Sequence, residues 1–114
     1  MNIDLSQAME AVDGDKDLLR ELISDFLGDY PEQMEGLWSG LENGDADQVE
    51  RRAHSLKSNI GIFGAREAYN LALELEERGR ESRLDGAASV FEQLESGLKG
   101  VASYFSSGAW EANV

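Results

Sequence analysis

The 114-residue sequence contains no cysteine, one proline and one histidine. The absence of cysteine excludes disulfide bonds, thiolate zinc sites and cysteine nucleophiles, and it agrees with a reducing compartment. One histidine cannot build a multi-histidine metal site. No apolar run approaches the roughly 20 residues that a transmembrane helix needs, and the N-terminus lacks the features of a signal peptide. We therefore expect a cytoplasmic protein.

Positive charge is also scarce. The chain has 10 lysine and arginine residues against 23 aspartate and glutamate residues, and its formal net charge is −13. Such a surface repels a nucleic-acid backbone and an anionic membrane, so we expect neither as a partner. Hydrophobic residues make up 41% of the chain, and their helical spacing argues against disorder. We expect one domain over residues 1–114, with its core at about 4–105 and 106–114 as a loose tail.

The spacing of apolar residues predicts five helices and no strand. The first is short and begins near Asp4, which has capping-box spacing with Gln7. Four longer helices follow. Their expected limits are Asp15 to Asn43, Asp45 to about Gly61, Ala65 to about Gly79, and Ser82 or Asp85 to Phe105. Short links between long amphipathic helices predict an all-α fold, an antiparallel up-down four-helix bundle with a short additional N-terminal helix.

The first long helix has three recognisable features. Asp15 is its expected cap, and Gly44 suits the left-handed residue that ends it. Pro31 cannot donate a hydrogen bond to the Leu27 carbonyl, so we expect a bend there. Asp45 and Gln48 then form a second capping box at the start of the next helix.

His54 lies on the second long helix. At 100° per residue it lies about 120° from the centre of that helix's apolar stripe, so we expect the ring to face solvent. Ser58 and Gly61 follow four and seven residues later on the same face. Lys57 lies between the histidine and the core, and Arg51 lies one turn earlier on the other side.

Residues 49–66 hold four of the ten cationic side chains and one carboxylate. An exposed histidine in such a stretch is most often an ordinary surface residue. Alternatively, its imidazole is a nucleophile that forms a covalent intermediate, and the nearby cations would stabilise a phosphoryl group there. No glycine-rich phosphate loop precedes a lysine, and no carboxylate pair stands out. A partner would therefore have to supply the metal and the activation.

At these residues the sequence resembles the histidine-containing phosphotransfer (HPt) domain family. The matching segment reads Ala53-His54-Ser55-Leu56-Lys57-Ser58-Asn59, followed by Ile60-Gly61-Ile62-Phe63-Gly64-Ala65. The next helix is also similar to the family, at Leu71, Ala72, Leu75 and Glu76. With the proline-containing helix upstream, the resemblance covers about residues 4–105. Ser58 departs from the glycine often found there, which bears on partner preference more than on activity.

This resemblance implies a phosphorelay intermediate and not an enzyme. HPt domains take a phosphoryl group from the aspartyl phosphate of one receiver domain and pass it to the aspartate of another. His54 would be the phosphorylated residue, Lys57 would stabilise the phosphoryl group, and Arg51, Ser58 and Gly61 would face the partner. Receiver domains of response regulators and hybrid sensor histidine kinases would be those partners. They would supply Mg²⁺, and this chain would need no cofactor of its own.

Two other functions fit the sequence. One is a non-phosphorylated helical-bundle interaction module that binds receiver domains or other signalling proteins. The other is a small hydrolase or phosphatase in which His54 is the general base and Glu50, one turn earlier, orients it. We expect a monomer, since a homodimer must not bury a histidine that meets a receiver. The initial methionine favours a free-standing protein over a domain cut from a larger kinase.

The rest of the docking surface is less defined. Leu5, Met9 and Val12 on the first short helix either contact a partner or pack over the end of the bundle, and we favour packing. Trp38 belongs to an apolar stripe and is expected in the core. Trp110 lies in the tail and has no assigned role.

Overall fold

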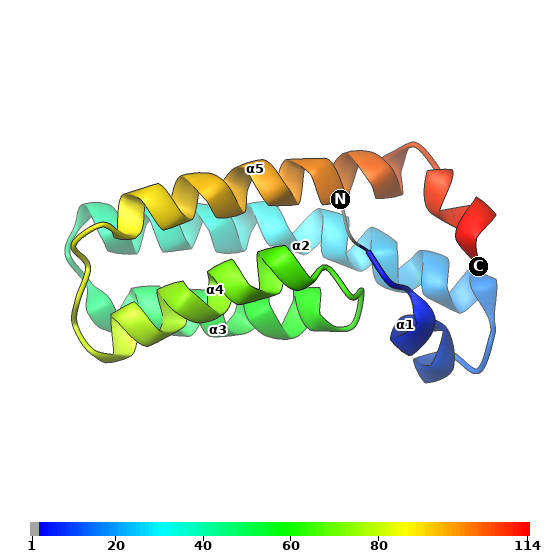
Figure 1. Cartoon of the computed structure of the whole chain (residues 1–114), viewed down its shortest axis with the longest axis horizontal. Coiled ribbons are helices and arrows are strands. Elements are labelled where there is room, and N and C mark those ends of the chain that lie inside the picture. The colour runs from blue at the N-terminus through cyan, green and yellow to red at the C-terminus, as the bar shows by residue number, and fades with distance from the viewer. Residues whose placement is uncertain (1–2) are drawn as a thin grey trace.

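The structure, a computed structural model, describes residues 3–114, and every regular element in that range is helical. The elements are α1 (Ser6–Ala11), α2 (Lys16–Glu42), α3 (Ala46–Gly61), α4 (Arg66–Arg80), α5 (Ala87–Ser106) and the 3-10 helix η1 (Ala109–Asn113). Figure 1 shows α2, α3, α4 and α5 running lengthwise beside one another, with α1 and η1 at the end where α2 begins. The expected all-helical fold is confirmed. None of the helices in the described range combines the length and hydrophobicity needed to cross a bilayer.

The limits of α2 follow from its sequence. The Asp15 side chain accepts hydrogen bonds from the backbone N–H groups of Asp17 and Leu18, at 3.0 and 3.2 Å, and so caps the helix as predicted. The helix continues through Pro31 as one element. It ends where Gly44 adopts a φ of 65°, a left-handed conformation that glycine reaches without strain.

The two predicted capping boxes form only in part. Asp45 Oδ1 accepts from the backbone N–H of Gln48 at 3.1 Å, as expected. The Gln48 amide does not return to Asp45 but donates to the Gly36 carbonyl on α2, at 2.7 Å, and so ties α3 to α2. At α1, Asp4 Oδ1 accepts from the backbone N–H of Ser6 at 2.9 Å, and the helix begins after Leu5. The predicted box between Asp4 and Gln7 is therefore wrong.

The core combines a helical stripe with an aromatic cluster. The predicted stripe of α3 is buried at Val49, Ala53, Leu56 and Ile60, and Ala46 at its start is half-buried. Phe26, Phe63 and Phe105 meet edge to face, with ring centroids 5.1 to 6.2 Å apart. These contacts join α2 to α5 and to the loop after α3, which holds α3 with its apolar face inward.

Three predictions are wrong: the burial of Leu18, the burial of Trp38 and the residue at which α5 begins. Leu18 and Trp38, assigned to the buried stripe of α2, are 44% and 40% exposed. Trp38 lies against the ring of Phe91, with centroids 5.1 Å apart, and remains open to solvent on its other side. Helix α5 begins at Ala87 and not at Ser82 or Asp85, because Gly86 adopts a left-handed φ of 77° just before it.

The C-terminal tail is not loose. Residues 109–113 form η1, and Trp110 within it is 3% exposed. Glu111 forms an ion pair with Arg20 of α2 at 2.5 Å, and the Arg20 guanidinium lies 5.9 Å from the centre of the Trp110 ring. A single large aromatic anchors this segment, and such an anchor leaves no periodic signal in the sequence.

Candidate functional site

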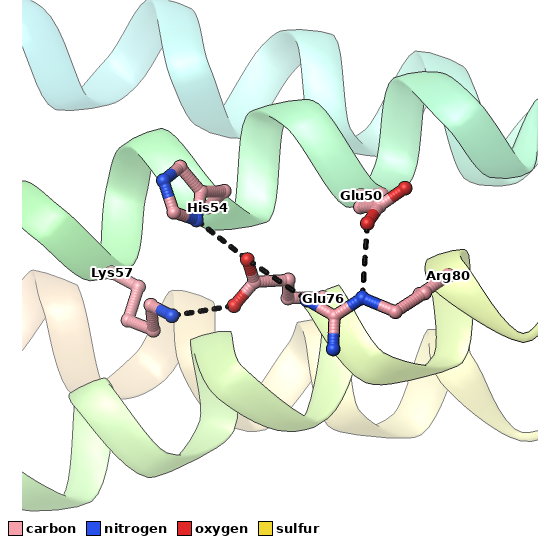
Figure 2. A network of polar contacts seen from close by, with 5 residues as sticks. All are labelled: Glu50, His54, Lys57, Glu76 and Arg80. Carbon is pink, nitrogen blue, oxygen red and sulfur yellow. Dashed lines mark hydrogen bonds and ion pairs between the residues drawn. The ribbon is translucent and has the colours of Figure 1, made fainter.

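His54 lies near the middle of α3, on the face opposite the buried stripe. Its side chain is 60% exposed, which confirms the orientation predicted from the helical wheel. Nδ1 of the ring lies 2.6 Å from Oε2 of Glu76 on α4. Figure 2 shows the second ring nitrogen, Nε2, on the side of the ring away from this carboxylate. The ring is therefore held at one nitrogen and open at the other.

Glu76 is the centre of a polar network between α3 and α4. Its side chain is 4% exposed, and its Oε1 accepts a hydrogen bond from Lys57 Nζ at 2.6 Å. The Arg80 guanidinium lies 3.4 Å from Oε2 of Glu76 and donates to Glu50 at 3.1 Å (Figure 2). A buried carboxylate is stable as a charge when it is paired and hydrogen-bonded in this way.

The ionisation of Glu76 sets the proton on the histidine. Burial acts to raise the pKa of Glu76, but the hydrogen bonds from Lys57 and His54 outweigh it and lower the pKa below its ordinary value. An ionised carboxylate can only accept, so Nδ1 of His54 must carry the proton in this contact. In the neutral ring the lone pair then lies on Nε2, the exposed nitrogen, which is the form required of a nucleophile.

A glycine brings the carboxylate within reach of the ring. A Cβ atom at Gly79 would lie 2.6 Å from the backbone nitrogen of Glu50 and 2.9 Å from the carbonyl oxygen of Ala46. Only glycine therefore allows α4 to lie this close to α3 at that point. Glu76 is one turn before Gly79, and Glu50 is one turn before His54. The close backbone contact thus sets the spacing of the network.

The other predicted site residues surround the histidine in two shallow depressions. Arg51 is exposed and lines one of them beside His54 and Arg80. Lys57, Ser58 and Gly61 line the second, which extends to α1. Lys57 is 18% exposed and is linked to His54 through Glu76. Among residues 3–114 no group of three or more histidine, aspartate or glutamate side chains is arranged to hold a metal ion.

The hydrophobic residues of α1 have a packing role. Leu5 and Val12 are 6% and 5% exposed, and Met9 is half-buried against the core. The interpretation that these three residues pack over the end of the helices is confirmed. What α1 presents to the second depression is polar, with Ser6, Gln7 and Glu10.

The carboxylate that holds the histidine is Glu76 and not Glu50, the one that the sequence suggests. Glu50, which lies one turn before His54 and is the expected orienting carboxylate of the hydrolase alternative, contacts Arg80 instead. In the sequence, Glu76 matches the family's helix, but that match assigns it no role. It had a signal of its own, because it interrupts the buried face of α4 formed by Ala72, Leu75 and Gly79. A carboxylate at such a position needs a partner on the neighbouring helix.

Comparison with known proteins identifies the family to which this chain belongs. The Hpt domain family model matches residues 21–105, so the chain belongs to the Hpt domain family. Members of this family are phosphocarriers that interact with receiver domains in phosphorelays, and they are not catalytic enzymes. The chain therefore has a histidine phosphotransfer role in a phosphorelay.

One solved structure is closely similar in fold. It is the crystal structure of histidine-containing phosphotransfer protein B (HptB) from Pseudomonas aeruginosa PAO1, which superposes with a TM-score of 0.86. The two chains are 27% identical, and the alignment covers 96% of this chain and 95% of that one. No curated protein matches the sequence. The family resemblance drawn from the segment around His54 is confirmed.

Proposed function

We propose that His54 is the residue that carries the phosphoryl group. The observation that supports this most directly is the contact of its Nδ1 with the buried, ionised Glu76, which leaves Nε2 exposed and unprotonated in the neutral ring. The donor is the aspartyl phosphate of one receiver domain, and the acceptor is the aspartate of another. Receivers of response regulators and of hybrid sensor histidine kinases both present these groups.

The transfer step follows from the position of the two nitrogens. The Nε2 lone pair attacks phosphorus, the N–P bond forms, and the P–O bond to the aspartyl carboxylate breaks with the carboxylate as leaving group. The ring gains positive charge while Nδ1 keeps its proton, and Glu76 at 2.6 Å stabilises that charge. Passing the phosphoryl group to the second receiver reverses these events.

The neighbouring residues support the same assignment. Lys57 and Arg51 place positive charge beside the ring and act on the phosphoryl oxygens. Ser58 is exposed and small, and Gly61 has no side chain, so both leave clearance for a receiver. Mg²⁺ and the acidic residues that hold it belong to the receiver.

The arrangement of the chain completes the proposal. Helices α2 to α5 form an antiparallel up-down four-helix bundle with α1 as the additional short helix, and residues 1–114 make one domain. The protein acts in the cytoplasm as a monomer, because transfer requires that His54 remain accessible to receivers.

The test is phosphotransfer from a panel of phosphorylated, Mg²⁺-loaded receiver domains to the wild type and to His54→Gln. We expect acid-labile, alkali-stable phosphate on the wild type and none on the variant. The variant should unfold within about 0.5 kcal/mol of the wild type, because an exposed side chain contributes little to stability. Glu77→Gln, which changes an exposed residue of α4, is the control that should still accept phosphate.

Two results would replace the proposal. Phosphate on His54→Gln would assign the carrier to another residue. Tight binding of a receiver without transfer to the wild type would indicate the non-phosphorylated interaction module instead.

A further inference from the structure

A groove lies between α2 and α5, away from the histidine. Its floor is apolar and aromatic and consists of Tyr30, Met34, Trp38 and Phe91, and Pro31 borders it. We call it the α2–α5 groove. It shares no lining residue with the depression beside His54. Figure 1 shows α2 and α5 in the upper half of the view and α3 and α4 below them.

The floor of the groove is held in place before any partner arrives. Trp38 is 40% exposed, but its ring rests on Phe91 with centroids 5.1 Å apart and planes inclined by 38°. Phe91 and Met34 are 7% exposed, so both are fixed in the core below it. A tryptophan ordered in this way loses little entropy on binding, and tryptophan is enriched among residues that dominate interface affinity.

The rim of the groove has one predominant charge. Glu35 on α2 and Glu92 and Glu95 on α5 border it, opposed by Lys99. All three glutamates are exposed. The rim thus carries three carboxylates against one lysine, on a chain of net charge −13. The groove is therefore complementary to positive charge around an apolar anchor.

From the fixed tryptophan, the apolar floor and the acidic rim, we propose that the α2–α5 groove is a second protein-binding surface. Its occupant is a basic amphipathic helix of a partner protein, with large apolar residues along one face and lysine or arginine beside them. Helices of this kind bind apolar grooves through anchors one turn apart. We expect this surface to act independently of phosphotransfer, because it shares no lining residue with the depression beside His54.

The probe is a synthetic helical peptide with leucine along one face and lysine elsewhere, compared with a peptide in which every lysine is glutamate. We expect the basic peptide to shift the NMR signal of the Trp38 indole N–H and to leave that of Trp110, which is 3% exposed, in place. Affinity measured by calorimetry should fall as salt is added. The acidic peptide should not bind.

Two variants of the groove separate the contribution of the Trp38 anchor from that of the acidic rim. Trp38→Ala should weaken binding of the basic peptide about tenfold or more, since it removes the anchor. Replacing Glu35, Glu92 and Glu95 together with glutamine should weaken binding about fivefold and flatten its salt dependence.

Matched variants elsewhere control for hydrophobicity and net charge. Leu18→Ala removes the other large hydrophobic residue that is strongly exposed in the described chain, at 44%. Replacing Glu21, Asp25 and Glu77 by their amides removes three exposed carboxylates outside the groove. Both variants, and His54→Gln, should bind the peptide like the wild type.

Several outcomes would overturn the proposal. They are the absence of a Trp38 shift at millimolar peptide, equal binding of the acidic peptide, and equal weakening by the matched controls. A Trp38 signal that shifts with protein concentration alone, together with a dimer mass in ultracentrifugation, would show that a second copy of the chain covers the groove.

Discussion

The α3–α4 contact and the α2–α5 groove join helices of one bundle in opposite ways. Between α3 and α4, Gly79 removes the side chain and lets the backbones meet, and the buried Glu76 lies one turn away with its charge paired. In the α2–α5 groove, Trp38 rests on Phe91, and the carboxylates of Glu35, Glu92 and Glu95 remain exposed on the rim. Close backbone contact thus accompanies a buried, paired carboxylate between α3 and α4, whereas an aromatic floor accompanies exposed carboxylates along the α2–α5 groove.

The largest expected effect comes from adding a methyl group at Gly79 in the α3–α4 contact, with Gly97 of α5, where a Cβ atom would meet nothing within 4 Å, as the matched control. Gly79→Ala should lower the free energy of unfolding by about 1–3 kcal/mol, because the new Cβ overlaps the backbone of α3. Gly97→Ala should raise it by about 0.5–1 kcal/mol, because alanine favours a helix and the space is open. Urea denaturation measures both. If the two variants shifted stability in the same direction, the close approach at Gly79 would not constrain the fold.

Removing the buried charge should give the next largest effect. Glu76→Gln leaves Lys57 half-buried without its counter-charge, so we expect a loss of about 1–2 kcal/mol in unfolding free energy. Phosphotransfer to His54 should slow about 10- to 100-fold, the range typical when the carboxylate that orients a metal-bound histidine is removed. Glu77→Gln is the control in both assays. Normal transfer by Glu76→Gln would show that the ring needs no orienting carboxylate.

Lowering the pH should remove the stabilisation that the ionised Glu76 carboxylate contributes, without a mutation. Folding lowers the pKa of Glu76 below its ordinary value of 4.5, because the hydrogen bonds from Lys57 and His54 outweigh burial. The stabilisation is therefore complete above pH 4.5 and is lost as the pH falls through the lower folded-state pKa. Unfolding free energies of the wild type and Glu76→Gln should converge over that acidic range. A difference in unfolding free energy that stayed constant down to low pH would contradict the ionised state assigned to Glu76.

The smallest effect should come from the outer edge of the network. Arg80 is 57% exposed and contacts both Glu50 and Glu76. Arg80→Gln should change the unfolding free energy by less than about 1 kcal/mol, because exposed ion pairs contribute little. The difference should shrink further at high salt. A loss as large as that of Glu76→Gln would place Arg80 among the essential partners of the buried carboxylate.

Local and periodic features could be predicted from the sequence. The stripe of α3, the Asp15 cap and the exposure of His54 depend on residues within a few turns of one another, where helical geometry alone decides the outcome. Glu76 and His54 are 22 positions apart, so their contact depends on how closely α4 approaches α3. The exposure of Trp38 depends in the same way on Phe91 of α5, and the burial of Trp110 depends on α2. These three outcomes could not be predicted from local sequence, because each depends on how whole helices pack together.

The position of His54 in the middle of α3 has a consequence for the lifetime of the phosphorylated state. Helix ends offer free backbone N–H groups that shelter bound phosphate, but every N–H near the centre of a helix already donates to a carbonyl one turn earlier. A phosphoryl group on Nε2 would therefore receive no main-chain donor from α3 and would be exposed to water. Its lifetime between two receivers would depend on the intrinsic stability of the N–P bond. We therefore expect the free phosphoprotein to lose phosphate at about the rate of an unprotected phosphohistidine until it meets a receiver.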